Sequence, residues 1–243
     1  MTFTSAEDVS PVTSRPVRRS WLVQRWEDLA FLHWAVDPAV VAPFLPRGTR
    51  PDIFEGQTYV GLIGFRMVRL GMVRGPGIPY LGTFCETNVR LYSVDAAGRR
   101  AVVFLSLDAE RLIPVLVAQA TLRLPYKWAR MSLRRDGDAF TYTSRRRSAT
   151  GSFTVRRGPA ITDPTPLEHF LTARWGLHTR AWGRTLHLPN EHPQWPLHRA
   201  TLEHLDETLI AATGLPAPAV PPVSVLSSPG VPVTFGGPQA LPV

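Results

Sequence analysis

Cysteine is nearly missing from this sequence: Cys85 is alone among 243 residues. A single cysteine cannot form an intrachain disulfide, and it cannot supply a cysteine-based zinc site by itself. Long apolar runs are missing too. The best candidate, Leu112–Leu122, is shorter than the ~20 residues of a membrane-spanning helix and is broken by Pro114 and Gln119. The first residues also lack the apolar core of a secretory signal, so we expect a cytoplasmic protein without a membrane partner.

Several motifs that mark whole enzyme classes are absent. The sequence has no GxSxG elbow, no P-loop, no GxGxxG fingerprint and no HExxH pair. Serine hydrolases, nucleoside triphosphatases, dinucleotide-binding enzymes and zinc proteases therefore lack their usual signals. His187, His192 and His198 lie near one another in the chain, but loop histidines between prolines are more often polar surface groups than metal ligands. We expect neither a metal nor a cofactor.

Lysine is the other scarce residue. The formal net charge is +8, yet among the 27 lysines and arginines only Lys127 is a lysine. The arginines are scattered, and the tight cluster Arg145–Arg147 has no aromatic residues between its members. A nucleic-acid site needs a continuous basic face with stacking side chains. The charge therefore indicates a solvated basic surface and no nucleic-acid partner.

What the sequence does contain is alternation of apolar and polar residues between Gly, Pro and Asp turns, which is typical of antiparallel β structure. The expected strands are Gln57–Arg69, Thr83–Val94, Ala101–Asp108, Lys127–Arg135, Ala139–Ser144 and Gly151–Arg157, with short pieces at Val223–Leu226 and Val231–Phe235. The second and third of these form one expected hairpin, and the fourth and fifth form another.

Four helices are expected within this β pattern, over Asp37–Leu45, Glu110–Leu122, Thr165–Trp175 and Leu202–Ile210. The first opens on an aspartate that precedes a proline, and the third has a glutamate three residues after its threonine, which is capping-box spacing. The last has leucines at helical spacing and is followed by Gly214, a natural stop.

Together these elements predict an α+β fold, mainly antiparallel β, arranged as a barrel or half-barrel with a few flanking helices. A barrel of modest size can hold one small ligand. The expected organisation is a single domain over residues 20–236, between a flexible N-terminal tail (1–19) and a C-terminal tail (237–243). A homo-oligomer is left open.

The strand Thr83–Val94 carries the best candidate site. One face holds Phe84, Glu86, Asn88, Arg90 and Tyr92. If this polar face meets water, it has only a solvating role. If it lines a barrel interior, its carboxylate and guanidinium would orient an acidic ligand.

Two further cations stand out. Arg66 lies on an otherwise apolar strand face, so it sits at a sheet edge or is buried against a carboxylate such as Glu86 or Asp108, or against a ligand. Lys127 would form a Schiff base with a carbonyl substrate if burial or a neighbouring cation lowered the pKa of its amine. Most lysines are surface groups, however.

Several blocks, in order, resemble the YqjF-like family of uncharacterised bacterial proteins. The blocks are Asp28–Val36 with Pro43–Pro46, Gly61–Met67, Glu86–Arg90, Phe104–Asp108, Leu124–Met131, Leu167–Leu171 with Arg174, and Trp195–Leu197. The family is similar in turn to acetoacetate decarboxylase, so the resemblance implies that enzyme's β-barrel-like fold over nearly the whole chain.

The same resemblance bears on the chemistry. Acetoacetate decarboxylase uses a Schiff-base lysine in a Pro-Lys-Lys motif, and the matching tripeptide here is Pro125-Tyr126-Lys127. Tyr126 falls on the nucleophile's position and Lys127 on the second lysine. One decarboxylase carboxylate falls near Glu86, and another acidic position falls on Arg66. The resemblance therefore implies that the barrel is kept and the nucleophile is lost.

Two functions stay open on this evidence. The first is a lyase-like enzyme acting on a small anionic carbonyl compound, with Lys127, Tyr126 and Glu86 as catalytic candidates and Arg66, Arg90 and Asn88 as ligand-binding candidates. The second is a binding or sensing protein that retains such a ligand without reaction. Neighbouring strand residues face opposite sides, so at most one of Tyr126 and Lys127 enters the interior.

Overall fold

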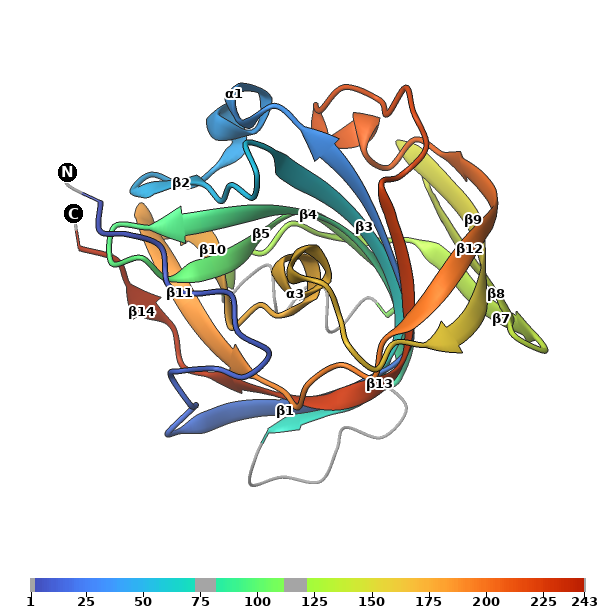
Figure 1. Cartoon of the computed structure of the whole chain (residues 1–243), viewed down its shortest axis with the longest axis horizontal. Helices are drawn as coiled ribbons and strands as arrows, with labels where there is room; N and C mark the ends of the chain where they lie inside the picture. The colour runs from blue at the N-terminus through green and yellow to red at the C-terminus, as the bar shows by residue number, and fades with distance from the viewer. Residues whose placement is uncertain (1–2, 73–81, 112–121, 243) are drawn as a thin grey trace.

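The computed structural model describes residues 3–72, 82–111 and 122–242. Most of them lie in strands of one continuous sheet (Figure 1). The strands are β1 (Ser20–Val36), β2 (Thr49–Pro51), β3 (Thr58–Met72), β4 (Phe84–Asp95), β5 (Arg100–Ala109), β6 (Tyr126–Trp128), β7 (Arg130–Asp136), β8 (Ala139–Arg146), β9 (Ala149–Ala160), β10 (Gly176–Ala181), β11 (Arg184–Glu191), β12 (His198–Glu207), β13 (Ser224–Gly236) and β14 (Gln239–Ala240). The helices are α1 (Pro38–Val41), η1 (Ala42–Phe44), α3 (Pro166–Thr172) and η2 (Ala211–Thr213).

Part of the sheet curls into a ring. Its order is β11-β10-β5-β4-β3-β1-β13, and β13 pairs back onto β11. The wall is loose at one place, because β5 and β10 pair in parallel only at Val102 and Leu177. Figure 1 shows α3 inside this ring. The predicted mainly antiparallel fold with flanking helices is therefore confirmed, although the barrel is loosely closed.

The remaining strands, β12-β9-β8-β7, continue from β13 and lie outside the ring (Figure 1). They bury a second apolar layer against the outer face of β1, β3 and β4, in which Leu32, Leu62 and Phe153 are fully buried. Burial of side chains of this size stabilises the fold by about 1.5–3 kcal/mol each. Gly64 permits the contact, because a Cβ there would lie 2.6 Å from the ring of Tyr142.

The predicted strands from Gln57 to Arg157 and both predicted hairpins are confirmed. Two helix starts are confirmed as well. Asp37 accepts a hydrogen bond from the Ala39 amide at the start of α1, and Thr165 and Glu168 form a capping box at the start of α3. The predicted helix Glu110–Leu122 lies mostly on residues 112–121, outside the described part of the chain.

The predicted helix Leu202–Ile210 is wrong, because most of it belongs to strand β12. The register of β12 on β9 shifts between Leu202 and His204, so Leu202 and Leu205 both face the core, opposite Val155 and Phe153. A β-bulge adds one residue and brings positions i and i+3 to the same face. The bulge therefore imitates the spacing of a helix. Gly214 does end a helix, the short η2, with a positive φ of 96°.

Both ends of the described chain contact the ring. The long strand β1 was not predicted as a strand, the two pieces near the C-terminus form the one strand β13, and β14 pairs with β11. Residues 3–19 have no regular structure but are held to the ring. The Thr4 amide donates to the Ala96 carbonyl, the Val17 amide donates to Glu191, and Trp175 donates to the Ser10 carbonyl.

Candidate active site

The polar face of β4 lies inside the ring. β4 is flanked by β3 and β5, and the exposed fractions of Glu86, Asn88, Arg90 and Tyr92 are 3%, 3%, 5% and 0%. The interpretation that this face meets water is therefore wrong. Buried ionisable groups need partners or a ligand, so each polar residue on this face should have one or the other.

Glu86 finds its partner on β6. This strand pairs in parallel with β5, with Tyr126 opposite Leu107, and the Tyr126 hydroxyl donates a hydrogen bond to Glu86 Oε2 at 3.0 Å. Burial raises the pKa of Glu86 to about 7, although hydrogen bonds from Tyr126 and Asn88 oppose the shift. Burial and the neighbouring carboxylate also raise the pKa of Tyr126. Glu86 can therefore take up and release a proton near neutral pH, as a general base must.

The raised pKa of Glu86 predicts a pH-dependent stability. The carboxyl binds its proton more tightly in the folded protein (pKa about 7) than in the unfolded chain, where its pKa has the ordinary value of 4.5, so the free energy of unfolding falls as pH rises between these values. At ~1.4 kcal/mol per pKa unit, the loss is about 3 kcal/mol by pH 8. We expect urea unfolding of Glu86→Gln to show a flatter pH profile and a higher stability than wild type at pH 8. The exposed control Glu55→Gln should follow wild type, and a Glu86→Gln profile as steep as wild type would contradict the assignment.

Arg90 lies on the same face, two strand residues beyond Asn88. Its guanidinium donates to the Tyr92 hydroxyl at 3.1 Å and to the Leu171 carbonyl at 3.0 Å, and it lies 5.7 Å from the Phe31 ring centroid. Within the described part of the chain, no carboxylate lies within ion-pair distance of Arg90. It lines a small cavity of about 20 Å³ together with Trp26, Thr172, Asn190, His192 and Trp195. That volume holds about one water molecule or one ligand oxygen.

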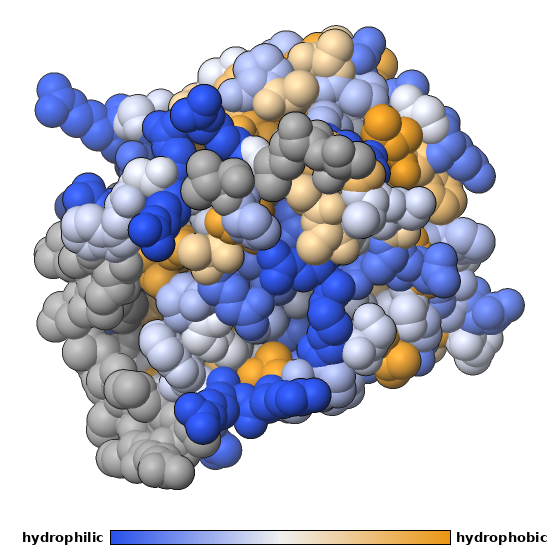
Figure 2. All heavy atoms as spheres, turned by 90° about the vertical axis from the view of Figure 1, so that its left-hand side faces the viewer, coloured by the Kyte–Doolittle hydropathy of each residue, from blue (hydrophilic) through white to orange (hydrophobic). Residues whose placement is uncertain are grey.

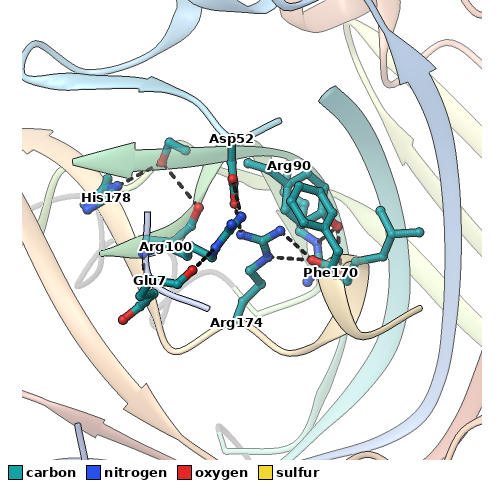
Figure 3. Close-up of polar contacts among 11 residues, drawn as sticks. Glu7, Asp52, Arg90, Arg100, Phe170, Arg174 and His178 are labelled. Atoms are coloured by element: carbon teal, nitrogen blue, oxygen red, sulfur yellow. Dashed lines mark hydrogen bonds and ion pairs between the residues drawn. The ribbon is translucent and has the colours of Figure 1, made fainter. Parts of the chain in front are cut away.

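The neighbouring arginines are satisfied by the protein itself. Figure 3 shows Arg100 and Arg174 both reaching the buried carboxylate of Asp52. Arg174 also donates to the Phe170 carbonyl, at 2.8 Å from Nε, and Arg100 donates to the backbone carbonyl of Glu7. Asp52 serves both of these guanidiniums, whereas Arg90 is buried without a carboxylate partner among the described residues and can take an anion.

His33 completes the inner face. Its Nε2 lies 2.7 Å from the Tyr92 hydroxyl, and the ring is fully buried. Burial, followed by the positive charges of Arg90 and Arg174, holds the pKa of His33 well below its usual range. The imidazole is therefore neutral and adds no further positive charge. His33 was not among the site residues predicted from the sequence. The feature that could have identified it is its place in the same long apolar segment as Phe31.

Two candidate residues lie elsewhere. Arg66 is half-exposed on the outer face of β3, where it pairs with Glu27 at 3.2 Å and Asp28 at 3.3 Å. The expectation that Arg66 meets Glu86 or Asp108 is therefore wrong. Asp108 forms an ion pair with Arg146 instead. Lys127 is exposed on the side of β6 opposite Tyr126. Of the six candidates, the structure brings Glu86, Asn88 and Tyr126 together, with Arg90 on the same face.

The described part of the chain lacks both a cluster of metal-ligating side chains and a membrane-spanning helix. Across residues 3–72, 82–111 and 122–242, no group of three or more His, Cys, Asp or Glu side chains is placed to hold a metal ion. Within the same ranges, no helix combines the length and the apolar character needed to cross a membrane.

Comparison with known proteins agrees with this fold. The model of the DUF2071 family, described as an uncharacterized conserved protein, matches residues 23–232. The uncharacterized protein YqjF of Bacillus subtilis is 29% identical over 209 residues, which cover 84% of this chain and 86% of YqjF.

Solved structures with the same fold include enzymes. The enduracididine biosynthesis enzyme MppR complexed with pyruvate has a TM-score of 0.61 at 16% identity, covering 95% of this chain and 93% of MppR. An acetoacetate decarboxylase-like enzyme from Sphingomonas wittichii has a TM-score of 0.62 at 12% identity, covering 98% and 99%. At these identities the likeness establishes the acetoacetate decarboxylase-like fold and not the reaction.

Proposed function

This chain belongs to the DUF2071 family of uncharacterized conserved proteins, and we propose that it binds a small organic carboxylate that carries a carbonyl group inside the ring and exchanges a proton with it. The carboxylate binds Arg90. The Glu86–Tyr126 pair carries out the proton transfer, so the reaction is enolisation at the carbon beside the carbonyl, a step that lyase-like chemistry on such compounds would share. No metal or cofactor takes part in the proposal.

The observation that carries the proposal is the buried guanidinium of Arg90, which has neutral partners only among the described residues. A buried charge without a counter-charge is costly. A ligand carboxylate would supply the counter-charge through bidentate hydrogen bonds, for which a guanidinium is well shaped. The bound pyruvate of the structurally similar MppR is the kind of ligand that this chemistry would select.

Glu86 and Tyr126 support the catalytic part. As a carboxylate, Glu86 removes a proton from the carbon next to the ligand's carbonyl group. Once Glu86 is protonated, it no longer needs the hydrogen bond from Tyr126, so the tyrosine hydroxyl is released to donate to the developing enolate oxygen. Glu86 then returns the proton to the product. The pKa of about 7 suits both directions at neutral pH.

A Schiff base is not part of this function. Lys127 is the only lysine in the sequence, and its side chain is exposed on the side of β6 away from Glu86. Exposure leaves this amine without the desolvation that activates a Schiff-base lysine. The presence of Tyr126 at the position of the decarboxylase nucleophile also favours the second candidate function, in which the ligand is bound without reaction.

Binding is tested first, by calorimetric titration with a panel of 2-keto acids and their neutral amides. We expect a keto acid to bind wild type and to bind Arg90→Gln at least about tenfold more weakly, because a charged hydrogen-bonded pair contributes about 1.5–3 kcal/mol. Arg66→Gln is the matched control, since it removes an arginine from the outer face and should not change the affinity. Equal affinities in wild type and Arg90→Gln would overturn the proposed ligand site.

A further inference from the structure

A larger cavity, of about 330 Å³, lies beside the loose part of the ring wall. β5 pairs with β10 at Val102 and with β6 from Leu107 onward. Between these points, residues 103–106 have no strand partner on that edge within the described residues. The cavity opens at this unpaired edge. Its volume is at the lower end of the range for small-molecule sites.

A β-bulge shapes the floor of this cavity. Arg90 lies opposite Phe104 and Val89 lies opposite Ser106, so Leu105 is the extra residue. Bulges redirect side chains and end regular pairing. Here both Phe104 and Leu105 line the cavity.

The cavity walls differ in character. One wall is apolar and consists of Pro43, Phe44, Leu45 and Pro46, from the end of η1 and the loop that follows. The other carries the exposed arginines Arg123 and Arg180, from the segment before β6 and from β10. Among the described residues, the lining contains no aspartate or glutamate. The face that carries β10 and β11 is mainly hydrophilic with small apolar areas (Figure 2). The cavity lining has the same mixed character, with apolar residues and arginines.

Arg123 is held in place by an aromatic ring. Its guanidinium carbon lies 4.7 Å from the centroid of the Trp182 ring, a cation–π contact that limits the freedom of the arginine. An arginine that is already oriented loses less entropy when it binds an anion.

We propose that this cavity is a second binding site, which takes a small organic carboxylate with an apolar body. Arg123 and Arg180 hold the carboxylate and the proline-rich wall covers the apolar body. This site does not depend on the proposed function of Glu86 and Tyr126. It lies next to the interior site, however, because Phe104 also lines the small cavity of Arg90. The two cavities therefore share Phe104 in their linings.

The test uses hexanoate as the probe, with hexanamide as the apolar body without charge and inorganic phosphate as the anion without an apolar body. Binding is followed by calorimetry and by the change in tryptophan fluorescence when the probe is added. The part of this change that comes from Trp182 should disappear in Trp182→Phe. We expect hexanoate to bind more tightly than either comparison compound. Arg123→Gln with Arg180→Gln should weaken hexanoate at least about tenfold, the size expected for charged hydrogen bonds.

Two control variants keep the result specific. Arg145→Gln with Arg147→Gln removes the same charge from exposed positions on another part of the surface and should leave hexanoate binding unchanged. Arg90→Gln separates the outer site from the interior one, because it removes the interior cation and keeps Arg123 and Arg180. An equal loss in the Arg145 and Arg147 variant would mean general charge attraction, and the absence of saturable binding to wild type would mean no site. A loss in Arg90→Gln alone would support the interior site and reject the outer one.

Discussion

Glu86→Gln is expected to slow proton exchange between a bound keto acid and solvent by about 10²–10⁴-fold, the usual contribution of a general base. Glutamine keeps the shape of the side chain and can still accept the hydrogen bond from Tyr126, but it cannot take up a proton. The measurement is loss of the α-proton signals of the keto acid in D₂O, followed by NMR. In wild type the rate should rise with pH as Glu86 ionises around its pKa of about 7.

The controls separate this mechanism from its alternatives. Lys127→Met should exchange protons at the wild-type rate, and borohydride should trap no adduct with the keto acid. A lysine adduct that disappears in Lys127→Met would replace the mechanism with Schiff-base chemistry. Wild-type binding without any exchange would leave the ligand-binding function and remove the catalytic one.

Asp52→Ala should destabilise the fold by about 3–5 kcal/mol, the cost of leaving a buried charge without its partner. The Asp52 carboxylate is 1% exposed and serves both Arg100 and Arg174. These contacts join the chain just after β2, strand β5 and Arg174, two residues after the end of α3, so their loss would release α3 from the ring wall. Urea unfolding of Asp52→Ala, with the exposed Asp163→Ala as the control, measures the difference.

A loss of less than about 1 kcal/mol, the range of exposed ion pairs, would contradict this account. It would mean that water reaches the arginines once Asp52 is removed. In that case α3 would be held mainly by its apolar side chains, such as Phe170, which is fully buried.

The sequence predicted which residues share a face more reliably than it predicted where that face lies. Alternation placed Glu86, Asn88 and Arg90 together, but it cannot tell a face that meets water from one inside a ring whose other face is also covered. Arg66 illustrates the converse. It shares a face with Leu62 and Gly64, which the outer strands bury. Arg66 itself lies beyond the edge of those strands and stays half-exposed.

Other parts of the site depend on contacts between distant residues. Asp52 and Arg174 are 122 positions apart, and no local pattern in the sequence connects them. The family resemblance supplied what periodicity did not. It marked the segment Asp28–Val36, which forms the second half of β1, and it implied that Tyr126 falls on the position of the decarboxylase nucleophile. The structure then placed that tyrosine beside Glu86.

The pairing of β1 with β13 has a consequence for synthesis on the ribosome. The register runs from Ser20 with Gly236 to His33 with Ser224, so β1 is translated well before the strand that pairs with it. Until then β1 presents an unpaired edge, and such edges promote association between nascent chains. A ribosome that stalls before residue 224 would release a chain whose ring cannot close. The ring therefore closes only once β13 has been made, and a chain that ends before residue 224 is an aggregation-prone fragment in place of a smaller working domain.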